Sequence, residues 1–371
     1  MYAHERSESR IDPDQIGLYT TPAVVRILVA LVRGAQPPAH LAVITGCRRG
    51  ETEPVLCDLR QRGIVVQEWE GYRLTRSGEL LAGRLLACAT RLFQTLYGRP
   101  NPSLPPMPLV AEGVLDDIGR LALPAYIEAF ECPERADPEI LAWMRSSGHI
   151  SETDGAFSLT GKGRAYLTFL DRCSRTIATI DRFNEFFESH ATSGVPEIAI
   201  KEIGDLFNAG LVVDQPVNAE QGFAYYLEII REAGWLHGVS NYSLPQIAAA
   251  IWERAVAGAE VELVITPELA GALWEEEIVK KGRDPAAFPT FRLYVSTVPV
   301  TVGLTVTDSA LSFGLCNPDG TYDTVHDLVG RTEGAVRWGE RLFRHYKEQA
   351  VPIEDFFRNR ENTTGSAGIQ Q

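Results

Sequence analysis

The hydrophobic positions in the first part of the chain follow helical spacing. Residues 22–32 form an apolar stretch with the length of a helix, and a shorter helix is expected over residues 39–44, after a Gly-Ala-Gln-Pro-Pro break. Leu56 and Leu59 lie three residues apart on a third helix. That helix is expected to end at Gly63, because glycine readily adopts the left-handed conformation that stops a helix.

The pattern then switches to alternation. Residues 64–66 and 72–74 flank a Trp-Glu-Gly turn, which predicts a hairpin of two short strands. Leu-Thr-Arg-Ser-Gly at residues 74–78 opens an amphipathic helix that extends to about residue 97. Three helices followed by a hairpin is the plan of a winged helix, a variant of the helix-turn-helix. This combination resembles the winged-helix domains of prokaryotic transcription regulators.

The same pattern returns 85 residues later. Over 31 aligned positions that begin at Leu56, seven residues of the first copy are identical to their counterparts in the second without any gap, and Tyr72 corresponds to Phe157. The identical pairs are Leu56 with Leu141, Arg60 with Arg145, Gly63 with Gly148, Leu74 with Leu159, Thr75 with Thr160, Gly78 with Gly163, and Leu85 with Leu170. These identities recur at a fixed spacing and lie where turns and helix ends restrict the type of residue. They therefore indicate a duplicated winged helix.

Beyond residue 196 strands and helices alternate. Strands are expected at residues 210–213, 235–239, 261–266, 291–295, 300–306 and 310–315, and helices at 219–233, 244–256, 267–280 and 333–349. Because such alternation is typical of helices packed on a central sheet, we expect a mixed, largely parallel α/β domain. The predicted fold class is therefore α+β with α/β: tandem winged helix-turn-helix domains followed by an α/β sensor domain.

These patterns also predict the domain boundaries. The expected parts are a basic winged helix at 18–98, a proline-rich linker at 99–111, a second, acidic winged helix at 112–172, connecting helices at 173–200, the sensor domain at 201–358 and a disordered tail at 359–371. Apolar residues of the connecting helices, among them Ile177, Ile180 and Phe187, lie at helical spacing, which is typical of a core or a dimer contact.

Charge is distributed unevenly between these parts. The 371 residues include 49 acidic and 35 basic side chains, a net charge of −14, which excludes a polycation that coats nucleic acid. Residues 20–99, however, contain eleven arginines, no lysine and six acidic residues, a local net charge of +5. A confined basic module is typical of a DNA-binding unit, although arginines clustered by chance on a solvated surface would give the same count.

The first copy supplies the candidate DNA contacts. A recognition helix reaches base edges with the side chains at its start, and neighbouring arginines bind phosphates. The candidates are Arg48, Arg49, Thr52, Arg60, Arg62, Arg73 and Arg76. Because proline is costly inside a helix, Pro54 predicts a helix start near Thr52, with Arg48 and Arg49 in the preceding turn. The wing tip at residues 68–70, Glu-Trp-Glu, opposes phosphate contact.

The second copy has the opposite charge. Residues 112–172 carry six basic and eleven acidic side chains, a net charge of −5. Because DNA phosphates would repel such a surface, we expect a packing or dimerisation role for this copy.

The six cysteines lie far apart and form no C-x-x-C pair. Neither a disulfide framework nor a thiolate zinc site is therefore expected, and most of these thiols should be reduced and buried.

Several runs in the last part of the chain are similar to a known family. They are residues 218–233, 261–268, 304–308, 313–323 with its Asp-Gly-Thr-Tyr-Asp, and 335–346. These runs resemble the archaeal regulators that join a winged helix to the methanogenesis regulatory protein middle domain, and residues 186–196 resemble the bridge between the two parts. The resemblance covers roughly residues 181–353 and implies an archaeal transcription factor whose carboxyl-terminal part senses a signal. This chain departs from the pattern in having two winged helices.

Polar and aromatic residues within these runs are the candidate ligand pocket. They are Asp308, Asp319, Tyr322, Asp323 and Trp338. The carboxylates, with His326 and Asp327, would line a pocket at the sheet edge. The alternative for these aspartates is turn capping. Asp323, His326 and Asp327 would form a metal site only with further ligands, which the sequence does not indicate, so we expect no metal and no cofactor.

The sequence contains none of the motifs expected of the enzyme classes that share this architecture. Small-molecule methyltransferases need a glycine-rich turn after the first strand, whereas residues 214–218 read Asp-Gln-Pro-Val-Asn. A phosphodiesterase-type sheet would need His-x-Lys ahead of its aspartate, whereas residues 302–307 read Val-Gly-Leu-Thr-Val-Thr. The chain also has no G-x-S-x-G, Walker loop or H-E-x-x-H. We predict a DNA-binding transcription regulator that is not an enzyme; the alternatives are a DNA-free interaction module and a methyltransferase.

The expected partners follow from this prediction. They are double-stranded DNA, a second copy of the chain and a small-molecule effector. The first fifteen residues are polar and no apolar run reaches the roughly 18 residues of a membrane span, so we expect no membrane association and a cytoplasmic location.

Overall fold

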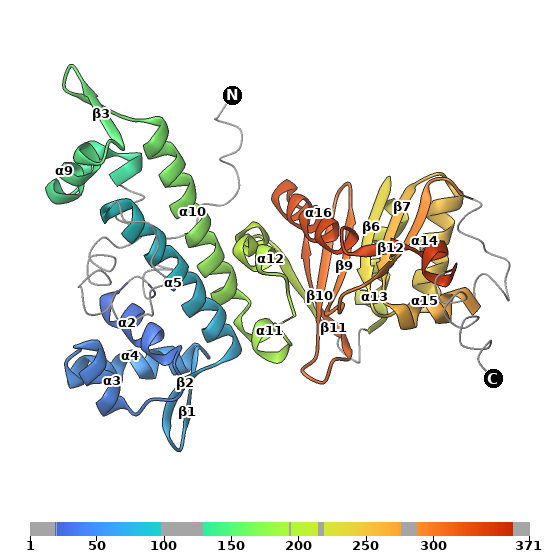
Figure 1. Cartoon of the computed structure of the whole chain (residues 1–371), viewed down its shortest axis with the longest axis horizontal. Coiled ribbons are helices and arrows are strands. Elements are labelled where there is room, and N and C mark those ends of the chain that lie inside the picture. The colour runs from blue at the N-terminus through green and yellow to red at the C-terminus, as the bar shows by residue number, and fades with distance from the viewer. Residues whose placement is uncertain are drawn as a thin grey trace, which may run out of the picture. The chain divides into compact units, whose positions relative to one another are not determined.

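The computed structural model describes Tyr19 and residues 21–97, 129–192, 194–213, 219–275 and 288–358 (Figure 1). The chain divides into two compact units. The first comprises Met1–Glu188 and Lys201–Phe207, and the second comprises Ser189–Ile200 and Asn208–Gln371. The predicted linker at 99–111 and the predicted tail at 359–371 lie outside the described residues.

The first copy of the repeat has the predicted order of three helices, a hairpin and a long helix. Its elements are α2 (Pro22–Leu31), α3 (Pro38–Thr45), α4 (Arg49–Gln61), β1 (Val65–Glu68), β2 (Gly71–Leu74) and α5 (Arg76–Tyr97). The apolar positions of the sequence pattern face inward, and Leu28, Leu41 and Leu59 are completely buried. Removing this apolar surface from water stabilises the small three-helix core.

Helix α4 begins earlier than the sequence predicts. Its first residue is Arg49, and the carboxylate of Glu51 accepts a hydrogen bond from the backbone N–H of Arg48 at 3.1 Å. Thr52 is completely buried within the first turn, so the predicted start near Thr52 is wrong. Pro54 is the sixth residue of α4, so it has no N–H to donate to the carbonyl four residues earlier, and the helix continues past it.

The second copy repeats these elements at a constant offset of 85 residues. Its described elements are η3 (Pro133–Arg135), α9 (Pro138–Ser146), β3 (Ile150–Thr153), β4 (Ala156–Leu159) and α10 (Gly161–Arg182). The two hairpins have the same antiparallel register, in which Val65 pairs with Leu74 and Ile150 pairs with Leu159. The predicted boundary at residue 172 falls inside α10, which continues as one helix to Arg182.

The residues that are identical in the two copies perform the same task. The hydroxyl of Thr75 donates to the Gly63 carbonyl at 2.7 Å and accepts from the Gly78 N–H at 3.1 Å. In the second copy, Thr160 makes the equivalent bonds at 2.8 Å and 3.1 Å. A Cβ atom at Gly78 would lie 2.1 Å from the Ile64 carbonyl oxygen, so no larger residue fits there. In each copy, the threonine and the glycine therefore hold the start of the long helix against the residues that precede the hairpin.

The long helices of the two copies pack against each other. Helices α5 and α10 lie side by side in Figure 1, and a disulfide joins Cys88 of α5 to Cys173 of α10. The sequence analysis, which expected no disulfide framework, did not predict this pair; the other four cysteines are free, as expected for most of them. The free cysteines are Cys47 and Cys316, which are buried, Cys132, which is half-buried, and Cys57, which is exposed.

Short helices α11 (Asn184–Ser189), α12 (Glu197–Lys201) and η4 (Ile203–Leu206) follow in the chain. The second unit is built on one eight-stranded sheet in the order β12-β8-β7-β6-β9-β10-β11-β5. The strands are β5 (Gly210–Val213), β6 (Trp235–Ser240), β7 (Glu260–Ile265), β8 (Phe291–Ser296), β9 (Val302–Thr307), β10 (Leu311–Cys316), β11 (Tyr322–Gly330) and β12 (Ala350–Pro352).

This sheet is mainly antiparallel, contrary to the prediction. Only the pairings of β7 with β6 and with β8 are parallel among the described strands. Strands β9, β10 and β11 are joined by tight turns, and such short connections allow only antiparallel pairing. The parallel pairs occur where α14 (Pro245–Val256) and α15 (Pro267–Leu273) supply crossover connections.

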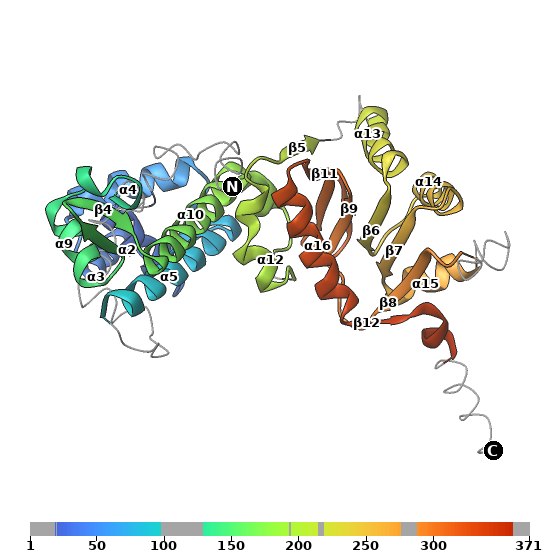
Figure 2. The same cartoon turned by 90° about the horizontal axis from the view of Figure 1, so that it is seen from above.

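Helices cover both faces of the sheet (Figure 2). One face carries α16 (Glu333–Lys347), whose Trp338, Leu342 and Tyr346 are buried against the strands. The other face carries α13 (Ala219–Glu232), α14 and α15. This second face is less completely filled, and it holds the cavity described below.

Candidate DNA-binding surface and ligand pocket

The outer face of α4 presents two of the candidate DNA contacts. Arg48, which precedes the helix, and Arg60, in its last turn, are exposed. The Arg60 guanidinium donates to the Gln67 carboxamide of the hairpin at 3.0 Å, which orients it without burying it. The structure places Arg49 at the first position of α4. Arg49 and Arg60 belong to the helix that a winged helix inserts into the major groove, and Arg48 directly precedes it.

The other four candidates are held by the protein itself. Thr52 is buried and its hydroxyl donates to the Arg48 carbonyl at 3.2 Å, so it does not reach a base edge. The remaining three arginines have intramolecular partners. These are Arg62 with Asp181 at 3.5 Å, Arg73 with Glu68 at 2.5 Å, and Arg76 with the Glu188 carbonyl at 2.8 Å.

Arg62 belongs to a small network at the base of α4. Its guanidinium lies 5.8 Å from the ring centroid of Tyr19, and the Tyr19 hydroxyl donates to the carboxylate of Asp181. Burial and the nearby Asp181 charge raise the pKa of Tyr19 above its usual range, so the phenol stays neutral. This network connects the residue before α2 to α4 and α10, which is a structural role.

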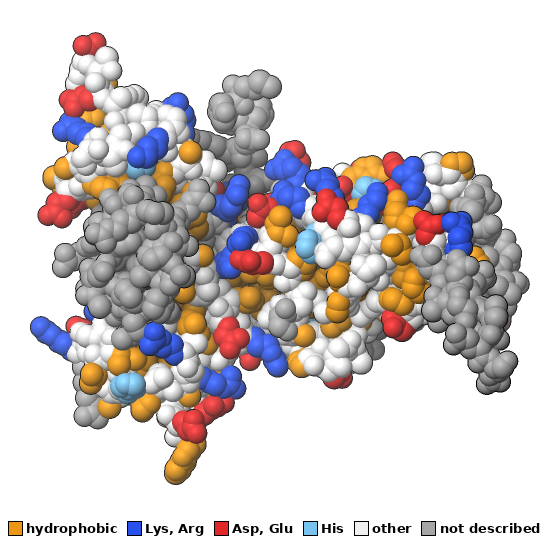
Figure 3. Space-filling model, in the orientation of Figure 1, with side chains coloured by type: hydrophobic (Ala, Val, Ile, Leu, Met, Phe, Trp, Pro, Cys, Tyr) orange, Lys and Arg blue, Asp and Glu red, His pale blue; other side chains and the backbone are white. Residues whose placement is uncertain are grey.

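The tip of the first hairpin is hydrophobic and acidic. Trp69 is fully exposed, and exposed Glu68 and Glu70 flank it. Figure 3 shows this projecting tip as an orange end with acidic side chains behind it. A phosphate-binding wing would instead carry basic side chains.

The second copy presents an acidic surface around its equivalent helix. Exposed Glu139, Glu152 and Asp154 lie on α9 and the β3–β4 hairpin, and Glu152 pairs with Arg145 at 2.5 Å. Its core holds His149, which is completely buried against Trp143 at a ring-centroid distance of 4.8 Å. Burial, together with the Lys162 charge, lowers the pKa of His149 to about 4.

A pocket of about 460 Å³ opens in the face of the sheet beneath α13, α14 and α15. Most of its lining is apolar, and four tyrosines, Tyr225 among them, add aromatic walls. Residues that line it include Ile229, Ile247, Ile251, Leu263, Leu269, Val329, Tyr226, Tyr242 and Tyr322. The rings of Tyr242 and Tyr322 are stacked at a centroid distance of 5.7 Å. A concave, mainly apolar cavity with few polar groups is typical of a small-molecule site.

The polar part of this pocket is centred on Asp327. Its carboxylate accepts hydrogen bonds from the Tyr322 hydroxyl at 3.1 Å and from the Ser312 hydroxyl at 3.0 Å. No lysine, arginine or histidine occurs among the described lining residues. Burial raises the pKa of Tyr226 to about 12, and burial with the Asp327 charge raises that of Tyr322. Both phenols therefore remain hydrogen-bond donors at neutral pH.

Of the five predicted pocket residues, only Tyr322 lines this cavity, together with Asp327, which the sequence placed beside them. Asp308 accepts a hydrogen bond from the Gly234 N–H at 3.0 Å, and Asp319 accepts from the Thr321 N–H at 2.9 Å. Asp319 therefore stabilises its own turn, whereas Asp308 connects the turn after β9 to the residue before β6. Trp338 is buried in the core on the α16 side of the sheet, where its indole N–H donates to the Ala199 carbonyl at 2.9 Å.

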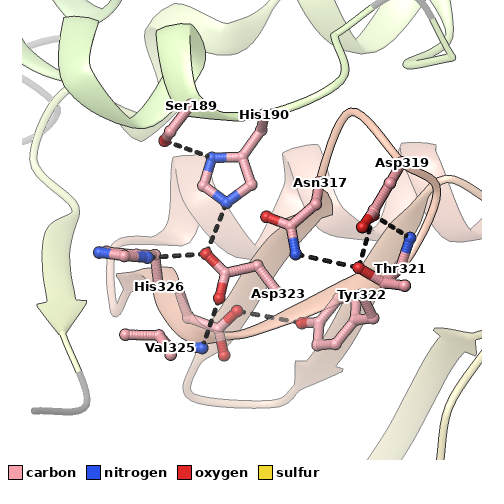
Figure 4. Close-up of polar contacts among 10 residues, drawn as sticks. Ser189, His190, Asn317, Asp319, Thr321, Tyr322, Asp323, Val325 and His326 are labelled. Carbon is pink, nitrogen blue, oxygen red and sulfur yellow. Dashed lines mark hydrogen bonds and ion pairs between the residues drawn. The ribbon is translucent and has the colours of Figure 1, made fainter.

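Asp323 belongs to a separate polar cluster. Its carboxylate Oδ2 lies 2.8 Å from Nε2 of His190 and 2.7 Å from Nδ1 of His326 (Figure 4). These two imidazoles and the backbone N–H of Val325, which donates to Oδ1 at 2.7 Å, hold the pKa of Asp323 below its usual range despite burial. The sequence patterns did not single out His190, which lies 133 positions before Asp323.

Among the described residues, no helix is both long and apolar enough to cross a bilayer.

Residues 221–349 match a family model described as the middle domain of the methanogenesis regulatory protein FilR1. A curated relative, the methanogenesis regulatory protein FilR1 of Methanothrix harundinacea (strain 6Ac), is 21% identical over 209 residues, which cover 56% of this chain and 47% of the relative. The chain therefore spans about half the length of this relative. These matches confirm the resemblance predicted for this part of the sequence.

Solved structures give weaker likenesses. TrmBL2, described as an archaeal chromatin protein with a novel mode of DNA binding, is 15% identical with a TM-score of 0.31, and the alignment covers 89% of this chain and 94% of that chain. A phospholipase D family member, Nuc from Salmonella typhimurium, is 13% identical with a TM-score of 0.30 over 39% of this chain and 96% of that one. Both TM-scores are low, so neither likeness establishes a shared fold.

Proposed function

We propose that this protein is a DNA-binding transcription regulator with tandem winged helices, in which the first copy contacts duplex DNA and the α/β unit binds a small-molecule effector. The match to a methanogenesis regulatory protein supports the regulatory role. The observation that supports the DNA contact is the pair of exposed arginines at the two ends of α4, Arg48 before its first turn and Arg60 in its last. Glu51 and Glu53 of the same helix are also exposed and would oppose phosphate contact between these ends. The acidic second copy would pack or orient the first rather than bind phosphates.

The effector would bind in the apolar pocket of the α/β unit. Because Asp327 is its one carboxylate and no cation lines the described part of it, an anionic ligand is disfavoured. The pocket instead suits a molecule with an apolar or aromatic body and a cationic or hydrogen-bond-donating group that points toward Asp327. Neither role requires catalysis, and we infer that the protein is not an enzyme. We also propose a homodimer, to be measured by sedimentation velocity.

A titration of the full-length protein against the DNA upstream of its own gene tests this function. We expect retardation of that fragment with an affinity that falls steeply as salt increases, because phosphate contacts release counterions. The same titration with candidate amines and aromatic metabolites should reveal an effector that changes the affinity. Binding that is absent at low salt would remove DNA from the proposed partners.

One observation favours a second candidate, a DNA-free interaction module. The fully exposed Trp69 between two glutamates is a surface that proteins use for protein contacts rather than for phosphates. This candidate predicts no retardation of any fragment and a partner protein whose capture depends on Trp69.

A further inference from the structure

We propose that His190, Asp323 and His326 bind one divalent transition-metal ion of the Zn²⁺ type. Nε2 of His190, Nδ1 of His326 and the Asp323 carboxylate all lie within 4.8 Å of one another. Two imidazole nitrogens and one carboxylate oxygen are the ligand set of many three-residue zinc sites, which keep a fourth position for water or another ligand. The site lies within the α/β unit, and it is independent of the proposed DNA binding.

The distances suit an ion after a small adjustment. In a tetrahedral site with bonds of about 2.0–2.1 Å, ligand atoms are roughly 3.4 Å apart. In the ion-bound state the two contacts of Asp323 Oδ2, at 2.8 Å and 2.7 Å, would each widen by about 0.6 Å. The two histidine rings stand nearly perpendicular to each other, at 78°, with centroids 6.0 Å apart. Their nitrogens therefore approach Asp323 from different directions.

Neighbouring groups orient the proposed ligands. The Ser189 hydroxyl lies 3.0 Å from Nδ1 of His190, which leaves Nε2 directed at the site, and the Val325 N–H holds Oδ1 of Asp323 (Figure 4). The backbone beside His190 is fixed to β10, because the Ala191 N–H donates to the Cys316 carbonyl at 2.8 Å. Hydrogen bonds of this kind fix the orientation of metal-binding histidines and carboxylates in known sites.

Burial sets the direction from which an ion would enter. The His190 side chain is completely buried, that of Asp323 is 11% exposed and that of His326 is 35% exposed. The ion would therefore enter past His326, which would also leave the open coordination position toward solvent. Without an ion, both imidazoles would share one carboxylate oxygen, and this hydrogen-bonded trio is the competing explanation.

Metal titration of the full-length protein separates the two explanations. After treatment with a chelator, the wild type should bind one Zn²⁺ per chain in calorimetry, and Co²⁺ should give the visible spectrum of a four- or five-coordinate ion. His326→Ala and Asp323→Asn should each weaken Zn²⁺ binding by at least about tenfold. His40→Ala, which removes an exposed histidine from α3 in the other unit, should leave binding unchanged.

X-ray absorption of the zinc-loaded wild type keeps the test independent of how the variants fold. It should show two imidazoles and oxygen ligands, with no sulfur. A wild type that binds no more Zn²⁺ than Asp323→Asn, or an ion coordinated by cysteine sulfur, would overturn the proposal in favour of the hydrogen-bonded trio.

Discussion

Cys88 and Cys173 occupy the same position in the two copies of one structural unit, and a disulfide joins them. Their sequence separation, 85 residues, equals the offset of the repeat. Contact between equivalent residues is what a two-fold arrangement of the two copies would produce. The two copies of the repeat, one basic and one acidic, therefore pack through their equivalent long helices, α5 and α10.

The disulfide should stabilise this arrangement. Reduction, or the double change Cys88→Ser with Cys173→Ser, is expected to lower the stability of the amino-terminal unit by about 2–4 kcal/mol, because the bond closes a long loop in the unfolded chain. Thermal melts with and without reductant measure the effect. Cys57→Ser, which alters an exposed free cysteine, is the matched control. Equal melting temperatures under both conditions would mean that the bond does not form in the protein.

The repeated glycines at the hairpin junctions should not tolerate a side chain. Gly78→Ala would place a Cβ 2.1 Å from the Ile64 carbonyl oxygen, and Gly163→Ala would make the same clash with His149. We expect each change to destabilise the protein by about 1–3 kcal/mol in urea unfolding. Gly83→Ala, on α5, meets nothing within 4 Å and should stabilise by about 0.5–1 kcal/mol. A lower free energy of unfolding for Gly78→Ala and a higher one for Gly83→Ala would confirm that the backbone of Gly78 lies against the Ile64 carbonyl.

The buried His149 predicts a pH dependence of the second copy. Its pKa is lowered to about 4 in the folded protein, whereas the unfolded chain takes up the proton near pH 6.5. The contribution of neutral His149 to stability should therefore be fully present above about pH 6.5. The free energy of unfolding should fall by about 1–3 kcal/mol as the pH drops toward 4. Urea unfolding followed by Trp143 fluorescence measures this. His149→Phe should flatten the profile, and an unchanged slope in that variant would assign the loss to other groups.

The basic start of α4 should contribute to DNA affinity. Arg48→Ala combined with Arg49→Ala is expected to weaken retardation of the upstream fragment about tenfold at fixed salt, about 1–3 kcal/mol. The salt dependence should also become shallower, since fewer counterions are released. Arg135→Ala with Arg164→Ala makes the same charge change in the acidic copy and should have little effect. Equal losses from both double variants would indicate a general charge effect rather than a contact by α4.

The winged-helix elements were predictable because their determinants are local. Gly63 and Gly148 have positive φ angles of 67° and 72°. Because glycine adopts this left-handed conformation readily, a glycine at a helix end predicts it from the sequence. The start of α4 was not predictable in the same way. There the hydrogen bond from the Arg48 backbone to Glu51 outweighs the tendency of Pro54 to begin a helix later.

The candidate site was harder to predict because it depends on contacts that are distant in sequence. The sequence patterns predicted no strand over residues 322–330, yet these residues form the long strand β11. Asp308 and Asp319 satisfy nearby backbone groups, which a sequence cannot distinguish from ligand binding. The sequence did single out Asp327, whose carboxylate accepts a hydrogen bond from Ser312. His190 was not predictable, because only the fold brings it beside Asp323.

Strand β11 carries two sets of side chains with different chemistry. Tyr322 and Asp327 line the apolar pocket, whereas Asp323 and His326, interleaved with them, belong to the proposed metal site. Because β11 contributes side chains to both sites, a shift of this strand on binding of the effector would also move the proposed metal ligands, and the reverse would hold for the ion. Occupancy of the two sites would therefore be thermodynamically linked, so that the ion changes the affinity for the effector by the same factor by which the effector changes the affinity for the ion.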